Sequence, residues 1–232
     1  MENIFISGIS SGIGKGLALY YANQGVKVYG ISRRLLDYNH ENITHAQLDI
    51  LNYQQTPFVI DKFLKGHKLD LVILNAGILG TMSSMKQADL DEMKAVMETN
   101  LWSQKVLLDS LIDSCKMKNV IAISSGAAVN GNMGWSGYSL SKAALNMLIQ
   151  LYAKEDLDTK YIALAPGLVD TAMQDYICGE VSGDKFPSVK RLQQARGTEN
   201  MPTPDEFAKK FNSALERICS LDSGSFIDIR GL

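Results

Sequence analysis

The chain contains 232 residues, of which 46% are hydrophobic and 21% charged, so it can fill the core of one α/β domain and is too apolar for extended disorder. Its net charge of −2 excludes the strongly basic surface that is typical of nucleic-acid-binding domains. No apolar run approaches the roughly 20 residues that a membrane-spanning helix needs, so we expect neither a nucleic-acid nor a membrane partner.

Short apolar runs alternate with segments of helical periodicity along the chain. We predict strands over residues 4–7, 26–31, 44–48, 69–74, 119–124, 160–164 and 225–229, and helices over residues 13–24, 53–65, 89–115, 138–154 and 204–219. Such alternation predicts an α/β protein with a single-domain Rossmann fold over residues 1–232. We expect a doubly wound parallel sheet of about seven strands with helices on both faces, and a ligand beyond the carboxyl ends of the strands.

Local signals mark two helix boundaries. Gly25 follows the first predicted helix as a C′ residue. Thr203 and Glu206 form a capping box at the start of the last helix, with Pro204 in its first position. The polar, glycine-bearing segment around 166–203 gives no comparable pattern, and we expect it to cover the substrate.

A glycine-rich loop follows the first predicted strand. Gly8, Gly12 and Gly14 have the spacing G-x-x-x-G-x-G and lead directly into a helix. Glycines permit a tight turn and a close approach of backbone N–H groups to a pyrophosphate, and the helix N-terminus adds a favourable dipole. The loop therefore predicts a dinucleotide site; the alternative is a glycine-rich turn without a ligand.

The end of the second predicted strand indicates which dinucleotide is bound. An NAD site usually has an acidic residue there, but this chain has Ser32, Arg33 and Arg34, and its next acid is Asp37. A guanidinium matches a 2′-phosphate in charge and in hydrogen-bond geometry. We therefore favour NADP(H), with Arg33 as its ligand; the alternative is that both arginines, and Arg34 in particular, are solvated.

Three residues predict acid–base chemistry. Tyr138 and Lys142 are four residues apart, on one face of a predicted helix, and Ser125 lies thirteen residues before the tyrosine. An ammonium beside a phenol lowers the phenol's pKa from roughly 10, which would let Tyr138 exchange a proton with a substrate oxygen. A lone Tyr-x-x-x-Lys motif is common by chance, so it predicts acid–base chemistry here only together with the glycine-rich loop upstream.

The remaining reactive side chains predict no metal site and no disulfide framework. The three cysteines are widely spaced and odd in number, which is typical of reduced thiols: Cys115, Cys178 and Cys219. The three histidines are scattered among polar residues and are expected at the solvated surface: His40, His45 and His67. The N-terminus has no signal-peptide pattern, so we expect a cytoplasmic protein.

These motifs together resemble the short-chain dehydrogenase/reductase family over essentially the whole chain. The resemblance implies that the following residues bind NADP(H): Gly8, Ser10, Ser11, Gly12, Ile13, Gly14, Ser32, Arg33, Asp49, Ile50, Asn75, Ala76, Gly77, Tyr138, Lys142, Pro166, Gly167, Val169 and Thr171. Among them, Asp49 matches the adenine contact, and residues 166–171 match the segment that holds the nicotinamide carboxamide.

The resemblance also implies a catalytic set and a reaction. Tyr138 would donate a proton to a carbonyl oxygen, Ser125 would hold that oxygen, Lys142 would bond the nicotinamide ribose, and Asn100 would position a water leading from Lys142 to solvent. The implied reaction is NADPH-dependent reduction of a small-molecule carbonyl to an alcohol. Family members usually form homodimers or homotetramers through two long helices, here 89–115 and 138–154.

A closer similarity is to the sepiapterin reductase and benzil reductase branch. It implies substrate contacts by Ser125, Trp135, Met173, Gln174 and Asp228. In sepiapterin reductases an aspartate that matches Asp228 anchors the pterin, but benzil reductases share it, so it does not separate a pterin from an aromatic diketone. Two other functions stay open: a non-catalytic NADP(H) sensor on the same fold, and an NAD-linked alcohol dehydrogenase.

Overall fold

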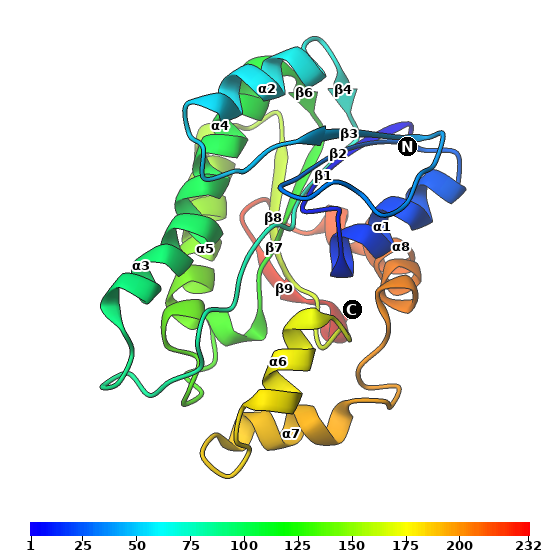
Figure 1. The fold of residues 1–232 in the computed structure, drawn as a ribbon. Coiled ribbons are helices and arrows are strands. Elements are labelled where there is room, and N and C mark those ends of the chain that lie inside the picture. The colour runs from blue at the N-terminus through cyan, green and yellow to red at the C-terminus, as the bar shows by residue number, and fades with distance from the viewer.

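The computed structural model describes residues 1–232 and contains a seven-stranded parallel sheet with the strand order β3-β2-β1-β5-β7-β8-β9 (Figure 1). The strands of this sheet are β1 (Asn3–Ser7), β2 (Lys27–Ser32), β3 (Ile43–Gln47), β5 (Leu71–Leu74), β7 (Asn119–Ile123), β8 (Lys160–Ala165) and β9 (Phe226–Asp228). The helices are α1 (Gly12–Asn23), α2 (Gln55–Leu64), α3 (Leu90–Met97), α4 (Ser103–Ser114), α5 (Ser136–Glu155), α6 (Ala172–Glu180), α7 (Pro187–Ala195) and α8 (Pro204–Ser220). The predicted α/β fold is thus confirmed.

The chain reverses its direction across the sheet beside β1. It runs outward from β1 through β2 to β3, then returns to β5 on the other side of β1 and continues outward to β9. The loops after β1 and β5 therefore leave the sheet in opposite directions, which opens a crevice at the carboxyl ends of these two strands.

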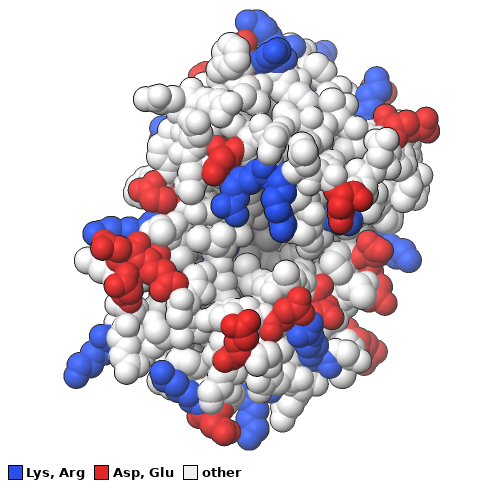
Figure 2. Space-filling view, viewed as in Figure 1, with Lys and Arg blue, Asp and Glu red and all other residues white.

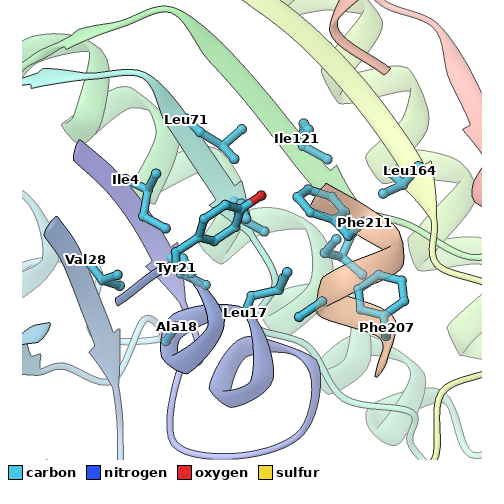
Figure 3. Close-up of a cluster of buried hydrophobic side chains, with 14 of the residues drawn as sticks. Ile4, Leu17, Ala18, Tyr21, Val28, Leu71, Ile121, Leu164, Phe207 and Phe211 are labelled. Atoms are coloured by element: carbon cyan, nitrogen blue, oxygen red, sulfur yellow. The ribbon is translucent and has the colours of Figure 1, made fainter. Parts of the chain in front are cut away.

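The two faces of the sheet carry separate apolar cores. Ile4 and Ile6 face α1 and α8, whereas Phe5 between them faces the opposite core, as strand alternation requires. Figure 3 shows side chains of the first core, including Tyr21 of α1 and Phe211 of α8, directed toward the strands. The second core is covered by α2, α4 and α5. No helix combines the length and apolarity that crossing a bilayer requires.

Two predicted elements are interrupted in the structure. The strand predicted over 69–74 breaks at Asp70, whose Oδ2 accepts hydrogen bonds from the backbone N–H groups of Glu2 (2.5 Å) and Asn3 (3.2 Å). Its first part is β4 (Lys68–Leu69), which pairs with β6 (Lys116–Met117) in a separate two-stranded sheet. The helix predicted over 89–115 contains a π-helical turn, Glu98–Trp102, between α3 and α4.

The segment around 166–203 contains two helices that the sequence analysis did not predict. Helices α6 and α7 lie together at one end of the molecule, beyond the sheet (Figure 1). Val189 and Leu192 of α7 and Ile177 of α6 are buried in a third, smaller apolar cluster that also contains Tyr138. These two helices, called the α6–α7 cover below, close the end of the crevice.

Candidate active site

A cavity of about 360 Å³ runs from the glycine loop to the α6–α7 cover. Figure 2 shows a hollow near the middle of one face, with basic side chains gathered along one edge. Every residue predicted from sequence to bind cofactor or substrate lines this cavity except Gly14 and Asp228. The predicted catalytic residues Ser125, Tyr138 and Lys142 line it as well, whereas Asn100 lies behind it.

The glycine loop has the backbone that a pyrophosphate site needs. Gly8 has a φ of +78°, a conformation that side-chain-bearing residues rarely adopt. A Cβ on Gly14 would lie 2.2 Å from the carbonyl oxygen of Gly8, so only glycine lets α1 approach the loop this closely. The first N–H groups of α1 have no partner within the helix, and the Ser11 side chain does not cap them. The loop therefore fits a bound diphosphate.

Asn75 fastens this loop to the end of β5. Its Nδ2 donates to the carbonyl oxygens of Ser7 (3.0 Å) and Gly8 (3.2 Å). The Ser7 hydroxyl in turn accepts from the backbone N–H groups of Asn75 (3.0 Å) and Ala76 (3.1 Å). Four hydrogen bonds thus fix the two strand ends that frame the crevice.

The arginine pair lies beside the glycine loop, and Arg34 makes the contacts. Arg34 Nη2 donates to the hydroxyl of Ser11 (2.8 Å) and, more weakly, to that of Ser10 (3.4 Å). Arg33 also lines the cavity, as predicted. Arg34 is exposed, but its guanidinium spans the gap between the β2 end and the phosphate loop, and whether either arginine binds a 2′-phosphate stays a prediction.

His45 supports the turn that carries the two arginines. The Ser32 hydroxyl donates to the Arg34 carbonyl oxygen (2.7 Å) and lies 2.8 Å from His45 Nε2. Since the only hydroxyl hydrogen of Ser32 points to the Arg34 carbonyl oxygen, we assign a hydrogen to His45 Nε2, which donates to Ser32. Burial lowers the pKa of His45, which favours this neutral ring. His45, expected at the solvated surface, is instead half-buried; its place behind the β2 end is set by strand pairing, which the sequence analysis did not resolve.

Tyr138 and Lys142 lie one turn apart on α5, at the floor of the cavity. Tyr138 is 9% and Lys142 4% exposed. Lys142 Nζ donates to the Ile123 carbonyl oxygen (2.7 Å) and lies 5.8 Å from the centre of the Tyr138 ring. Ser125 follows β7, and its hydroxyl lies close enough to the Tyr138 side chain to influence the tyrosine pKa. The three side chains are thus brought together as predicted.

The electrostatics of this group differ from the sequence-based expectation. Burial raises the pKa of Tyr138 and outweighs the lowering by the Ser125 hydroxyl. Burial also lowers the pKa of Lys142 to about 8. The expected lowering of the tyrosine pKa by Lys142 is therefore wrong for this structure, because desolvation dominates both groups. Tyr138 is a protonated phenol at neutral pH.

Asn100 lies in the π-helical turn and is fully buried. Its Oδ1 accepts from the Ile78 N–H (2.8 Å), and its Nδ2 donates to the Ile78 carbonyl (2.8 Å) and to the Ser141 hydroxyl (3.0 Å). The side chain therefore fixes the backbone after β5 against α5, close to Lys142. The expected positioning of a water by Asn100 stays a prediction.

Trp135, Met173 and Gln174 lie at the far end of the cavity, where a substrate is expected. The Trp135 indole N–H donates to the Ser188 hydroxyl of α7 (2.8 Å), which joins the start of α5 to the α6–α7 cover. The sequence analysis missed three apolar residues that complete this wall: Leu168, Ile177 and Leu192. The i, i+3 spacing of Val189 and Leu192 after Pro187 was the available signal for α7.

Asp228 is not brought into the cavity. Its carboxylate accepts hydrogen bonds from Nε (2.9 Å) and Nη2 (2.6 Å) of Arg230. The Arg230 side chain in turn lies against Gly167, where a Cβ would be 3.2 Å from it. The pair thus braces the loop after β8, and substrate anchoring by Asp228 has no support in this geometry.

Comparisons with known proteins agree with the fold and the motifs. Residues 2–180 match the family model described as short chain dehydrogenase. The chain is 31% identical to benzil reductase ((S)-benzoin forming) of Bacillus subtilis (strain 168), over 99% of both chains. The structure of the YIR035C short chain dehydrogenase/reductase from Saccharomyces cerevisiae superimposes with a TM-score of 0.86 at 25% identity, covering 99% of this chain and 96% of that one.

A more distant solved structure, ElxO with NADP bound, has the same fold. It has a TM-score of 0.77 at 24% identity and covers 98% of this chain and 96% of its own. The family match over most of the chain, together with the meeting of Ser125, Tyr138 and Lys142 in one cavity, leads to one conclusion. The chain belongs to the short-chain dehydrogenase family of oxidoreductases.

Proposed function

We propose that this protein reduces a ketone or diketone carbonyl to an alcohol with NADPH, and that Tyr138 is the proton donor. The observation that carries the proposal is one cavity with a protonated, buried tyrosine at its floor and two arginines at its cofactor end. The similarity to benzil reductases favours an aromatic diketone as substrate. A pterin is less favoured, because Asp228 is occupied by Arg230.

The residues at the floor have distinct roles in this reaction. The Ser125 hydroxyl donates a hydrogen bond to the carbonyl oxygen and holds it beside Tyr138. The Tyr138 hydroxyl gives its proton to the same oxygen, and its raised pKa keeps that proton available at neutral pH. The reduced nicotinamide, when bound, supplies the hydride to the carbonyl carbon. Lys142 lies next to Tyr138 and would bond the nicotinamide ribose of the bound cofactor.

The cofactor would lie along the carboxyl ends of the strands. Residues of the glycine loop would hold the diphosphate, Asp49 and Ile50 the adenine, and Pro166, Gly167, Val169 and Thr171 the carboxamide. Arg33 and Arg34 would bind the 2′-phosphate, since paired N–H groups on a fixed charge suit its geometry.

We also propose a homodimer or homotetramer. Trp102 beside α4 and Met147 and Leu151 on α5 expose about half of their apolar surface. Exposed apolar side chains on neighbouring helices are typical of an oligomer interface. Light scattering at micromolar concentration tests this, and a monomer would contradict it.

The test of the function is NADPH consumption by the purified protein. The panel contains benzil, sepiapterin and simple aldehydes and ketones, with NADH as the cofactor control. We expect turnover of benzil and a preference for NADPH. Selectivity for sepiapterin would move the protein to pterin reduction, equal use of NADH would overturn the cofactor assignment, and tight NADPH binding without any turnover would favour a sensor.

A further inference from the structure

Gln174 is the one amide side chain that reaches the substrate end of the cavity. It lies in the first turn of α6, lines the cavity and is only 8% exposed. Ile177, one turn later on the same face, lines the cavity too and packs in the same apolar cluster as Tyr138. The face of α6 that carries Gln174 is therefore turned toward the catalytic tyrosine.

The surroundings of Gln174 are apolar and uncharged. The other side chains at this end are Trp135, Leu168, Ala172, Met173, Ile177 and Leu192. The charges of the α6–α7 cover do not line the cavity: Arg196 is paired with Asp170 (3.2 Å) and with Asp175. Such a pocket suits a neutral aromatic or aliphatic substrate, with few polar groups to orient it.

The two polar atoms of the Gln174 amide have different environments. Its Oε1 is approached by the Cys178 thiol at 3.9 Å, a weak contact from the next turn of α6. Its Nε2 donates to no group of the protein. The Nε2 atom keeps accessible surface in the cavity, so its N–H groups are free to donate to an acceptor on a ligand there. The amide therefore offers a hydrogen-bond donor to the cavity.

The position of this donor is fixed by the packing of the cover. Gln193 Nε2 of α7 donates to the Cys178 carbonyl of α6 (3.1 Å), and the Trp135–Ser188 bond holds α7 against the start of α5. The donor on α6 and the donors at Ser125 and Tyr138 are thus parts of one braced wall and floor. Two separated donor groups in an apolar pocket match a substrate with two acceptor oxygens.

We propose that Gln174 is a specificity-determining residue that donates a hydrogen bond to the second carbonyl oxygen of a vicinal diketone. The first carbonyl, held by Ser125 and Tyr138, receives the hydride from NADPH at carbon and the phenol proton at oxygen. The second carbonyl is unchanged, so the product is an α-hydroxyketone. This inference rests on the proposed carbonyl reduction and adds to it the residue that recognises the second carbonyl of the substrate.

The experiment compares two substrates that differ by one oxygen, benzil and deoxybenzoin (1,2-diphenylethanone). Gln174→Met keeps the length of the side chain and removes the donor. We expect kcat/KM for benzil to fall about tenfold, as for a lost buried hydrogen bond, and kcat/KM for deoxybenzoin to change less than about twofold. Gln174→Glu replaces the N–H donor by an acceptor, so we expect its kcat/KM for benzil to fall further than that of Gln174→Met.

Met173→Leu is the matched control, because this neighbour lines the same wall without a hydrogen bond. It should change kcat/KM for benzil and for deoxybenzoin by the same factor. The NADPH dissociation constant of each variant verifies that it is folded, and a variant that fails this check is replaced by Gln174→Leu. Equal losses on benzil and deoxybenzoin with Gln174→Met, or no loss on benzil, would overturn the role of Gln174 alone. Absence of turnover of both substrates by the unaltered protein would overturn the proposed function and this inference together.

Discussion

The two ends of the cavity are built from different interactions. At the cofactor end, backbone conformation and polar contacts connect the strand ends: the Gly8 turn, the Asn75 hydrogen bonds and the Arg34–Ser11 contact. At the substrate end, apolar side chains of the α6–α7 cover pack together, with the Trp135–Ser188 bond as the main polar contact to α5. The cofactor end therefore depends on particular residue types, whereas the substrate end depends on the summed volume and the shape of its apolar side chains.

The largest expected effect is at Tyr138, where the two ends meet. Tyr138→Phe removes the proton donor and keeps the ring that packs with Ile177. We expect kcat to fall by about 10²–10⁴-fold, the usual range for loss of a general acid, with the NADPH dissociation constant changed little. Steady-state kinetics and fluorescence titration measure the two quantities. A near-normal kcat in this variant would contradict the assignment of Tyr138 as the proton donor.

The next effect concerns the buried ammonium of Lys142. Its pKa is lowered from 10.5 to about 8 by burial, so the unfolded chain binds its proton more tightly than the folded one. Stability is therefore reduced below about pH 8 and recovers as the pH rises toward 10.5, by up to about 3 kcal/mol from this group. Urea unfolding at pH 7 and pH 10 should show this rise, and Lys142→Met should lack it.

The comparison between the native protein and Lys142→Met isolates the group, because all other titrations are common to both. Lys154 offers a matched control, since it lies on the same helix α5 and is exposed. Lys154→Met should leave the pH dependence intact. An equal pH dependence in the Lys142→Met and native proteins would show that the ammonium is solvated or compensated.

The next prediction concerns the two arginines at the cofactor end, which are substituted one at a time. Arg34→Ala removes the contacts to Ser10 and Ser11 and a charge next to the phosphate loop. We expect kcat/KM for NADPH to fall about tenfold or more, in line with a charge-assisted hydrogen bond, with little change for NADH. Arg33→Ala should show the same selectivity. Equal losses with both cofactors would mean that the arginines support the loop without reading the 2′-phosphate.

The cofactor end was largely predictable because its determinants are local. Gly8, Gly12 and Gly14 are required by backbone geometry, and the two arginines follow β2 directly in the chain and line the cavity. What the sequence could not supply was the contact of Arg34 with Ser11, because it depends on how the turn after β2 lies against the glycine loop. The position of His45 could not be predicted either, because its contact with Ser32 depends on the register of β3 against β2.

The substrate end was less predictable because its contacts are long-range. Helix α7 is short and its burial involves only a few apolar positions in a polar segment, so its periodicity was not recognised. The strand-terminal Asp228 has the position of a substrate anchor in the chain, yet its partner is Arg230, only two residues away. The π-helical turn at Asn100 was likewise hidden in an apparently continuous helix.

The smallest expected effect tests whether the substrate end tolerates the loss of a single polar contact, as its apolar packing implies. Ser188→Ala and Trp135→Phe remove the same hydrogen bond from its two sides, and Trp135→Phe also removes part of the apolar ring. Ser188→Ala should cost about 1 kcal/mol in the free energy of unfolding, and Trp135→Phe should cost more. Both should raise KM for the substrate a few-fold, with the NADPH dissociation constant unchanged. Because the two groups share one bond, the double variant should cost no more than the Trp135→Phe change alone, within about 0.5 kcal/mol. Additive losses would show that the hydrogen bond itself contributes little and that each side chain acts through other contacts. A loss of NADPH binding in either single variant would show that the two ends of the cavity are coupled.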